Sequence, residues 1–193
     1  MSCRNAVALT QTGTCREALA DMSEVHLRLT TFSYRFAEQV LNGRLATKQE
    51  LENALRSPGL EASDISRGQF NKAFRNILVS KGWTAQPTVF DGDPGDPGAR
   101  MDFLKDRIGV EIGFGHGSFL GIDVLKFQIS SYSGLDKIDV GVYVAPTSAL
   151  QKAIAVKGGG TWAGFLTFEK IVRYLPYFKS AIQVPIYVIG LDL

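Results

Sequence analysis

The chain has 193 residues, of which 45% are hydrophobic and 21% charged, a composition that excludes a disordered, fibrous or disulfide-rich chain. This length fits one domain with one sizeable core, spanning residues 1–193. The formal net charge of +2 is far below the excess that would by itself indicate nucleic-acid binding.

The two cysteines, Cys3 and Cys15, have neither metal-ligand spacing nor partner histidines, so we expect a reduced pair in a bacterial cytoplasm. The sequence shows no secretory leader pattern and no apolar run near the roughly 18 residues that cross a bilayer. Secretion and membrane insertion are therefore not expected.

Helices are predicted for most of the first 82 residues. Apolar residues recur at three- and four-residue steps over residues 17–43, which predicts a long amphipathic helix that ends at Gly43. A second helix is predicted to start at Thr47, with Glu50 completing a capping box, and to end at Pro58-Gly59. The apolar face of residues 64–83 predicts a third helix that stops at Gly82.

The second half of the chain has the pattern of an α/β fold. Residues 90–103 (FDGDPGDPGARMDF) are too rich in glycine and proline for a helix or a central strand, and predict an exposed loop. Beyond it, β-branched runs predict strands and amphipathic runs predict helices. The predicted strands are 107–114, 137–144 and 184–191, and the predicted helices are 118–132, 146–154 and 168–178, the last ended or kinked by Pro176.

Two acidic residues flank a predicted turn. Asp102 lies at the end of the loop and Glu111 within the strand 107–114, so a hairpin through Lys105 and Asp106 would bring the two carboxylates together. Two neighbouring acids with one open side suffice to hold Mg²⁺ for phosphodiester hydrolysis. The alternative is a pair of solvated surface carboxylates, but burying Glu111 among apolar neighbours costs several kcal/mol unless it is paired or metal-bound.

The surrounding residues carry a resemblance to a known family. The run MDFLKDRIGVEIGFGHGSF, followed by DKIDVGVYV, resembles the catalytic hairpin and next strand of the BglII, BstYI and BamHI branch of the PD-(D/E)xK nucleases, most closely BstYI. The similarity extends more loosely over residues 70–191, whereas residues 1–60 match only in their helical character. The resemblance implies an α/β fold of the restriction-endonuclease kind, with a central mixed sheet flanked by helices.

The resemblance also implies a function. Such enzymes are type II restriction endonucleases that act as homodimers on double-stranded DNA and cut a short palindrome with Mg²⁺. A GATC-centred site such as RGATCY or GGATCC, 5′ overhangs and a cognate DNA methyltransferase in the same cell are the corresponding expectations. The apolar faces of residues 118–132 and 148–154 would form either the dimer seam or only the core. Rival interpretations are a repair or recombination nuclease of the same fold and a nuclease-derived DNA-binding protein.

By this resemblance Asp102 and Glu111 are metal ligands, with the carbonyl of Ile112 as a further ligand. The family has Lys, Glu or Gln two positions after the second acid, where this chain has Gly113. Three explanations stay open. Water or a DNA phosphate activates the nucleophile, a neighbouring side chain such as His116 or Gln128 substitutes, or the protein binds DNA without cutting it well.

Several residues near the hairpin are candidate DNA contacts. His116 follows the catalytic strand, so it is either a catalytic base, a base-reading residue or a solvated loop residue. Ser118 contacts bases or caps the next helix. The remaining DNA-binding candidates are Asn71, Lys105, Lys157 and Thr161, each of which is otherwise a solvated polar residue. Asp139, among strand apolars, is expected to stabilise the fold through Lys137 or an amide.

Overall fold

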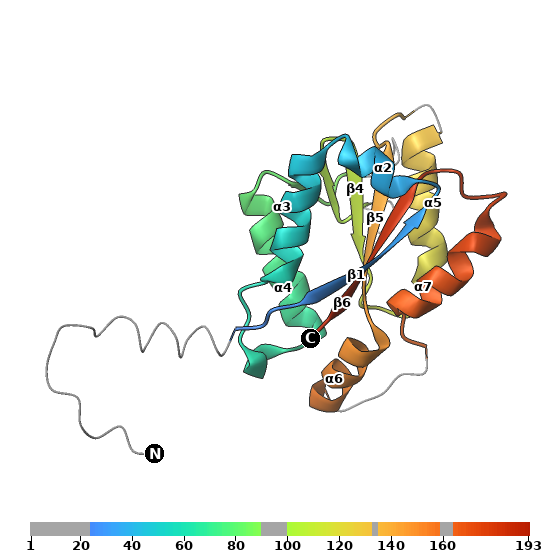
Figure 1. Ribbon diagram of the computed structural model, residues 1–193. Coiled ribbons are helices and arrows are strands. Elements are labelled where there is room, and N and C mark those ends of the chain that lie inside the picture. The colour runs from blue at the N-terminus through green and yellow to red at the C-terminus, as the bar shows by residue number, and fades with distance from the viewer. Residues whose placement is uncertain (1–23, 90–99, 133–134, 159–163) are drawn as a thin grey trace, which may run out of the picture.

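The computed structural model describes residues 24–89, 100–132, 135–158 and 164–193. Its centre is a mixed six-stranded sheet in the order β1-β6-β5-β4-β3-β2 (Figure 1). The strands are β1 Arg28–Tyr34, β2 Thr84–Ala85, β3 Phe103–Lys105, β4 Ile108–Ile112, β5 Val140–Pro146 and β6 Ile186–Asp192. Strands β4, β5 and β6 are parallel, and the outer pairs β1-β6, β4-β3 and β3-β2 are antiparallel. The predicted α/β fold with a mixed sheet flanked by helices is confirmed.

Helices cover both faces of the sheet. They are α2 Ala37–Asn42, α3 Leu45–Arg56, α4 Arg67–Ser80, α5 Phe119–Tyr132, α6 Ser148–Gly158 and α7 Phe168–Tyr174, with short 3-10 turns η1 Ala62–Asp64 and η3 Leu175–Phe178. Helices α3 and α4 lie on one side of the sheet, and α5 and α7 lie on the other (Figure 1). Accordingly, the buried residues form two apolar clusters, one on each face.

Strand β5 lies at the centre because its sequence suits burial on both faces. All seven of its residues are buried, and valines dominate the run VGVYVAP. Such continuous apolar runs are typical of parallel strands covered by helices on both sides. Helix α5 is the crossover between β4 and β5, so the end of β4 leads directly into the loop before α5.

The predicted helix over residues 17–43 is wrong for Arg28–Tyr34 and right only for Ala37–Asn42. Residues Arg28–Tyr34 form strand β1, which pairs with β6 along its whole length, from Arg28 opposite Asp192 to Tyr34 opposite Ile186. Only α2 is helical, and it begins after Arg35 and Phe36, which both adopt positive φ. The threonines and aromatics of this run also favour a strand, and the partner strand decides between the two patterns. Residues 17–23 lie outside the described residues.

The second and third helices are confirmed, with one correction. Helix α3 starts at Leu45. The predicted capping box is wrong, because the Thr47 hydroxyl donates to Asp106. The Glu50 carboxylate accepts hydrogen bonds from Trp83 and Lys105. Helix α4 has a serine N-cap and stops before Gly82, which has φ +82°. Helix α7 ends at Tyr174, and Pro176 lies in the following 3-10 turn. Among the described residues, we find no helix that combines the length and the apolar character needed to cross a membrane.

Candidate active site

The predicted hairpin exists and brings the two acids together. Strands β3 and β4 pair with Phe103 opposite Val110, and the turn residues Asp106 and Arg107 have φ of 48° and 61°. A two-residue hairpin turn with both residues in this left-handed region matches the twist of its strands. Asp102 lies directly before β3, and its Oδ2 accepts a hydrogen bond of 2.8 Å from the backbone N–H of Ile112.

Helix α5 adds two charged residues that the sequence pattern did not single out. The Nζ atom of Lys126 lies 2.5 Å from Oε1 of Glu111 and 2.9 Å from Oδ1 of Asp123, and it donates to the carbonyl of Arg100 at 3.1 Å. Lys126 is buried, with 6% of its surface exposed. The available signal was a pair of charged residues one turn apart in an otherwise uncharged helix that follows the acid-bearing strand.

Tyr143 occupies the space beside Gly113. Tyr143 lies beside Glu111 in the parallel register of β4 and β5, and its ring is fully buried. A Cβ atom at position 113 would lie 2.6 Å from the Tyr143 hydroxyl and 2.7 Å from its Cε1. The hydroxyl donates a hydrogen bond of 2.8 Å to Oδ2 of Asp123. The glycine is therefore required by the tyrosine that fills the adjacent space.

The site gathers several acidic groups. Asp102, Glu111 and Asp123 bring three carboxyl groups close to the ammonium group of Lys126, and Arg67 and Arg100 border the same hollow. Burial, together with the negative charges of Asp102 and Asp123, raises the pKa of Glu111 to about 9. Burial also raises the pKa of Asp102, against the hydrogen bond from Ile112. Pairs of buried acids with raised pKa values are typical of functional sites.

The acids line a polar hollow of about 270 Å³. It is bounded by the end of β4, the start of α5, α4 and Arg100. Its lining residues are Arg67, Asn71, Gln86, Arg100, Asp102, Glu111, Ile112, Gly113, Phe114, Gly115, His116, Phe119, Asp123, Lys126, Tyr143 and Leu166. A second hollow of about 340 Å³ shares Asn71 and Asp102 with it and adds Lys72 and Arg75 of α4. Together they form an acidic centre with a basic margin.

The acid pair fits a divalent cation. Within the described residues, no three His, Cys, Asp or Glu side chains form a complete protein-built metal site. Mg²⁺ does not need one, because it is usually held by one or two carboxylates together with waters and substrate phosphates. Asp102, Glu111 and Ile112 all border the hollow, and a bound cation would stabilise the ionised forms of the two acids, whose pKa values burial raises.

The other predicted site residues fall into two groups. Asn71 and His116 line the hollow, and Ser118 lies beside His116, with Oγ 2.9 Å from Nδ1. Lys105 lies outside the hollow, because its Nζ donates to Oε1 of Glu50 and to the carbonyl of Lys81, both at 2.7 Å. The structure therefore gives its DNA-binding prediction no support.

Gln128 does not replace the missing side chain at Gly113. Its Oε1 accepts hydrogen bonds from the backbone N–H groups of Gln183 and Val184, and it does not border the hollow. The two remaining DNA-binding candidates stay predictions. Thr161 lies outside the described residues, and of Lys157 only the backbone, at the end of α6, is described.

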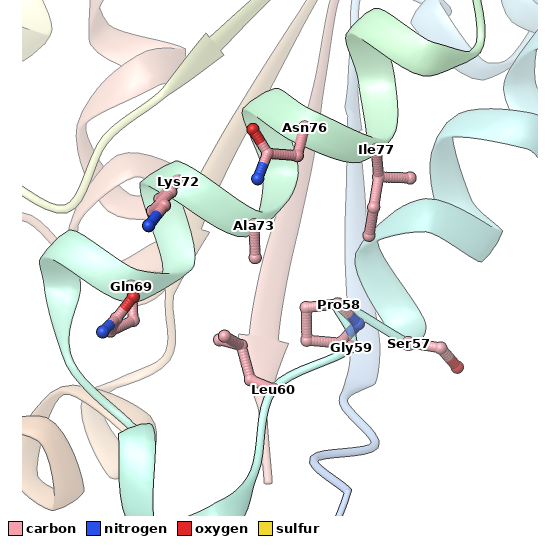
Figure 2. Close-up of a pocket in the computed structure, with 9 residues that line it drawn as sticks. All are labelled: Ser57, Pro58, Gly59, Leu60, Gln69, Lys72, Ala73, Asn76 and Ile77. Carbon is pink, nitrogen blue, oxygen red and sulfur yellow. The ribbon is translucent and has the colours of Figure 1, made fainter.

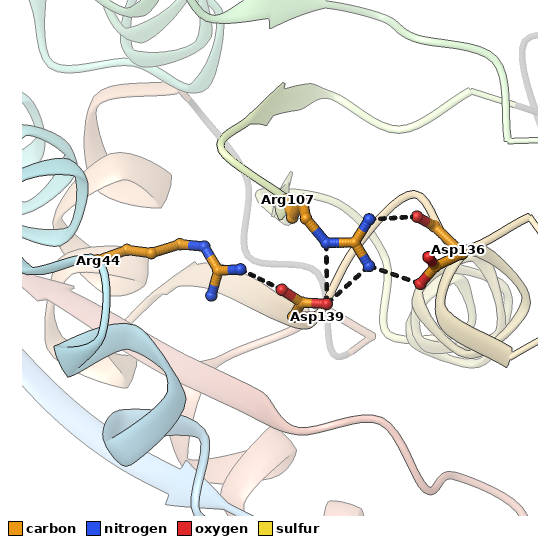
Figure 3. A network of polar contacts seen from close by, with 4 residues as sticks. All are labelled: Arg44, Arg107, Asp136 and Asp139. Atoms are coloured by element: carbon orange, nitrogen blue, oxygen red, sulfur yellow. Dashed lines mark hydrogen bonds and ion pairs between the residues drawn. The ribbon is translucent and has the colours of Figure 1, made fainter.

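The opposite end of the hairpin carries a balanced ionic network (Figure 3). Arg107 donates to Oδ1 of Asp139 from Nε at 3.0 Å and from Nη2 at 2.7 Å, and also bonds Asp136, while Arg44 pairs with the other oxygen of Asp139. These bonds lower the pKa of Asp139. The structural role expected for Asp139 is supported, but its partners are the two arginines rather than Lys137, which donates to backbone carbonyls.

A separate hollow of about 390 Å³ lies between α4 and the segment that follows α3 (Figure 2). It is lined by Ser57, Pro58, Gly59, Leu60, Gln69, Lys72, Ala73, Asn76 and Ile77. Among these residues only Lys72 carries a charge and none is acidic, so this hollow offers no carboxylate to hold a metal ion. The acidic hollow remains the candidate active site.

Fold and site together define an α/β protein of the restriction-endonuclease type. Two solved structures are similar to this chain: restriction endonuclease BglII complexed with a DNA 16-mer (TM-score 0.64, 17% identity, 86% of this chain and 78% of that chain) and free BglII (TM-score 0.53, 18% identity, 86% and 80%). At these identities the likeness shows the fold alone. No curated protein matches the sequence.

The family is shown by the sequence itself. The family model described as restriction endonuclease BglII/BglIII matches residues 29–191, and the chain belongs to this family. It is therefore a restriction endonuclease, an enzyme that hydrolyses DNA. The match includes β1, α2 and α3, so the family relationship extends further toward the N-terminus than expected. The particular similarity to BstYI stays a prediction.

Proposed function

We propose that this protein is a type II site-specific deoxyribonuclease that hydrolyses phosphodiester bonds of double-stranded DNA with Mg²⁺. The observation that carries the proposal is the buried acid pair on the β3–β4 hairpin, open to a polar hollow with basic residues at its margin. The family assignment supports the reaction class, and the similar BglII structure was determined with a DNA 16-mer.

Within this proposal Asp102 and Glu111 hold the cation, with the carbonyl of Ile112 as a further ligand. A bound Mg²⁺ polarises the scissile phosphate and lowers the pKa of a bound water. The backbone N–H of Ile112 holds the Asp102 carboxylate in place. Ile112 would thus position Asp102 through its N–H and bind the cation through its carbonyl. The hairpin thereby preorganises the ligands before DNA binds.

The DNA-facing surface runs from the hollow along α4. Arg67, Lys72 and Arg75 are exposed on this helix and border the two joined hollows, where they would neutralise phosphates. Asn71 lies between them and approaches the acids. His116 and Ser118 lie in the loop after β4, exposed and suited to contact base edges or the scissile phosphate. Lys157 and Thr161 stay proposed contacts of the 157–164 segment.

We further propose a C2 homodimer that cuts a palindrome. Helix α5 exposes Phe119, Ile122, Leu125 and Tyr132, which recur at steps of three or seven residues and therefore form one stripe. Two copies of a self-complementary stripe would place two active sites in symmetric relation, as a palindrome requires. A GATC-centred site such as RGATCY or GGATCC, 5′ overhangs and a methyltransferase partner complete the proposal.

Digestion of an unmethylated plasmid with Mg²⁺ tests the function. We expect discrete fragments whose sequenced ends share one palindrome, and no cleavage when EDTA removes the metal. Smearing or the absence of cleavage would contradict site-specific cutting. Sequence-specific binding without cleavage in Mg²⁺ or Mn²⁺ would indicate a DNA-binding protein instead. A preference for a four-way junction over linear duplex would indicate a repair nuclease.

A further inference from the structure

We propose that Lys126 of α5 is a catalytic residue that takes the place of the side chain missing at Gly113. The inference rests on the proposed function and names a group of that same site. Position 113 of β4 and position 126 of α5 border the same hollow, one from the sheet and one from the helix that covers it.

The first argument is the position of the ammonium group. Its Nζ lies 2.5 Å from Oε1 of Glu111, so it is beside a proposed metal ligand and within reach of any water or phosphate held there. Lysines are rarely buried unless they are paired, because removing an ammonium group from water is costly. This ammonium is held in place by Asp123 at 2.9 Å and by the Arg100 carbonyl at 3.1 Å.

The second argument is that the usual position is closed. Any side chain at position 113 would begin with a Cβ atom 2.6 Å from the Tyr143 hydroxyl, far inside van der Waals contact. Tyr143 is fully buried and donates to Asp123, which in turn pairs with Lys126. Tyr143 therefore leaves no room for a side chain at position 113 of β4. Through Asp123 it also helps to hold Lys126 of α5 in place. Tyr143 and Asp123 are positioning residues.

The role of Lys126 follows from its chemistry as a donor. In the hydrolysis a water oxygen bonds to phosphorus, the bond from phosphorus to the leaving oxygen breaks with its electron pair, and the proton lost by water reaches the leaving oxygen through solvent. Lys126 stays an ammonium group throughout. If Glu111 shared its charge with a cation, the ammonium group now paired with Oε1 would be able to orient the attacking water and to stabilise charge on the phosphate.

The test uses single-turnover cleavage of the cognate duplex by the full chain at saturating Mg²⁺. Lys126→Met keeps the length of the side chain and removes its charge, and we expect cleavage to slow by about 10²–10³-fold. Binding of the same duplex in Ca²⁺ should change by less than about fivefold, which a merely structural defect would not spare. The matched control is Lys179→Met, because Lys179 is exposed beyond η3 and does not border the hollow.

A second variant keeps the test decisive if Lys126→Met does not fold. Lys126→Arg retains the positive charge between Glu111 and Asp123, but its planar guanidinium cannot place a donor at the position of Nζ. We expect normal folding, normal DNA binding in Ca²⁺ and cleavage slowed by at least about tenfold.

Two different failures are distinguishable. If the wild-type protein does not cleave DNA, the proposed function fails. If it cleaves and a folded Lys126 variant cleaves within about threefold of its rate, the assignment of Lys126 is overturned while the proposed function stands.

Discussion

The two ends of the β3–β4 hairpin carry opposite electrostatic arrangements. At the turn, two arginines face Asp136 and Asp139, the charges balance, and the pKa of Asp139 is lowered. At the open end, Asp102, Glu111 and Asp123 lie close together around Lys126, and burial raises the pKa of Glu111 to about 9. The first arrangement stabilises the fold, whereas the second holds buried acids whose ionised forms a bound cation would stabilise.

Activity and stability should therefore respond separately to mutation of the two ends. Substitutions of the acids at the open end should remove cleavage and spare folding. Substitutions at the turn should weaken folding and spare cleavage.

The largest effect is expected at the open end. Glu111→Gln or Asp102→Asn removes a proposed metal ligand, so Mg²⁺-dependent cleavage should fall by about 10³-fold or more, corresponding to about 4 kcal/mol of transition-state stabilisation. The melting temperature of Glu111→Gln without metal should change little near pH 7, because glutamine has nearly the size of a carboxyl group that its pKa of about 9 already leaves uncharged. A large fall in melting temperature would show that this end is structural.

Gly113→Ala probes the packing beneath the open end. Its Cβ would lie 2.6 Å from the Tyr143 hydroxyl, so the buried ring must move, and we expect a loss of about 1–3 kcal/mol in the free energy of unfolding. Urea denaturation measures this loss. Gly68→Ala is the matched control, because a Cβ at Gly68 meets no atom within 4 Å and should cost little. Equal stability of the two variants would contradict the steric explanation.

Asp139→Asn tests the turn. The Asp139 side chain is 32% exposed, so solvent screens its ion pairs, and we expect a loss of about 1 kcal/mol, or about 2–4 °C in melting temperature. Below that temperature the variant should cut DNA at the wild-type rate. Loss of cleavage by a folded variant would show that the turn also serves the chemistry.

The pH dependence of this loss follows from the lowered pKa of Asp139. The stabilisation is present above the unfolded value near 3.8 and is lost as the pH falls through the lower folded value. Urea midpoints of the wild type and Asp139→Asn should therefore differ at pH 7 and converge toward pH 3. A constant difference over this range would contradict the ionic origin of the effect.

The smallest effect is expected on the basic margin of the hollow. Arg75→Gln should weaken binding to all DNA sequences alike and reduce the slope of log K against log salt by about 0.9, as loss of one phosphate contact would. Arg173→Gln on α7, across the sheet from α4, is the control. A change in sequence preference would indicate base contact instead.

Much of the fold follows from local sequence, but β1 does not. The apolar patterns of helix α4 and of strands β4 to β6 each fit only one kind of secondary structure, and these elements occur as predicted. Residues 28–34 also fit a helical spacing, and only their pairing with β6, far along the chain, makes them a strand. Non-local pairing of this kind is not encoded in local periodicity.

The candidate site was predictable in the same uneven way. Asp102 and Glu111 lie on one hairpin, so their proximity followed from the sequence. The roles of Lys126 and Tyr143 did not, because they reach the hollow from α5 and β5 through packing. In the sequence, Gly113 lacks the polar side chain that the family has at this position. The parallel register of β4 and β5 explains the glycine, because it places Tyr143 in the adjacent space.

The catalytic role of the open end is tested most directly by comparing two variants, Glu111→Gln and Asp139→Asn. Both are assayed side by side for Mg²⁺-dependent cleavage of the same unmethylated plasmid, at a temperature where both are folded. We predict wild-type fragments from Asp139→Asn and uncut plasmid from Glu111→Gln. Discrete fragments from Glu111→Gln would contradict the assignment of the open end of the hairpin as the catalytic centre.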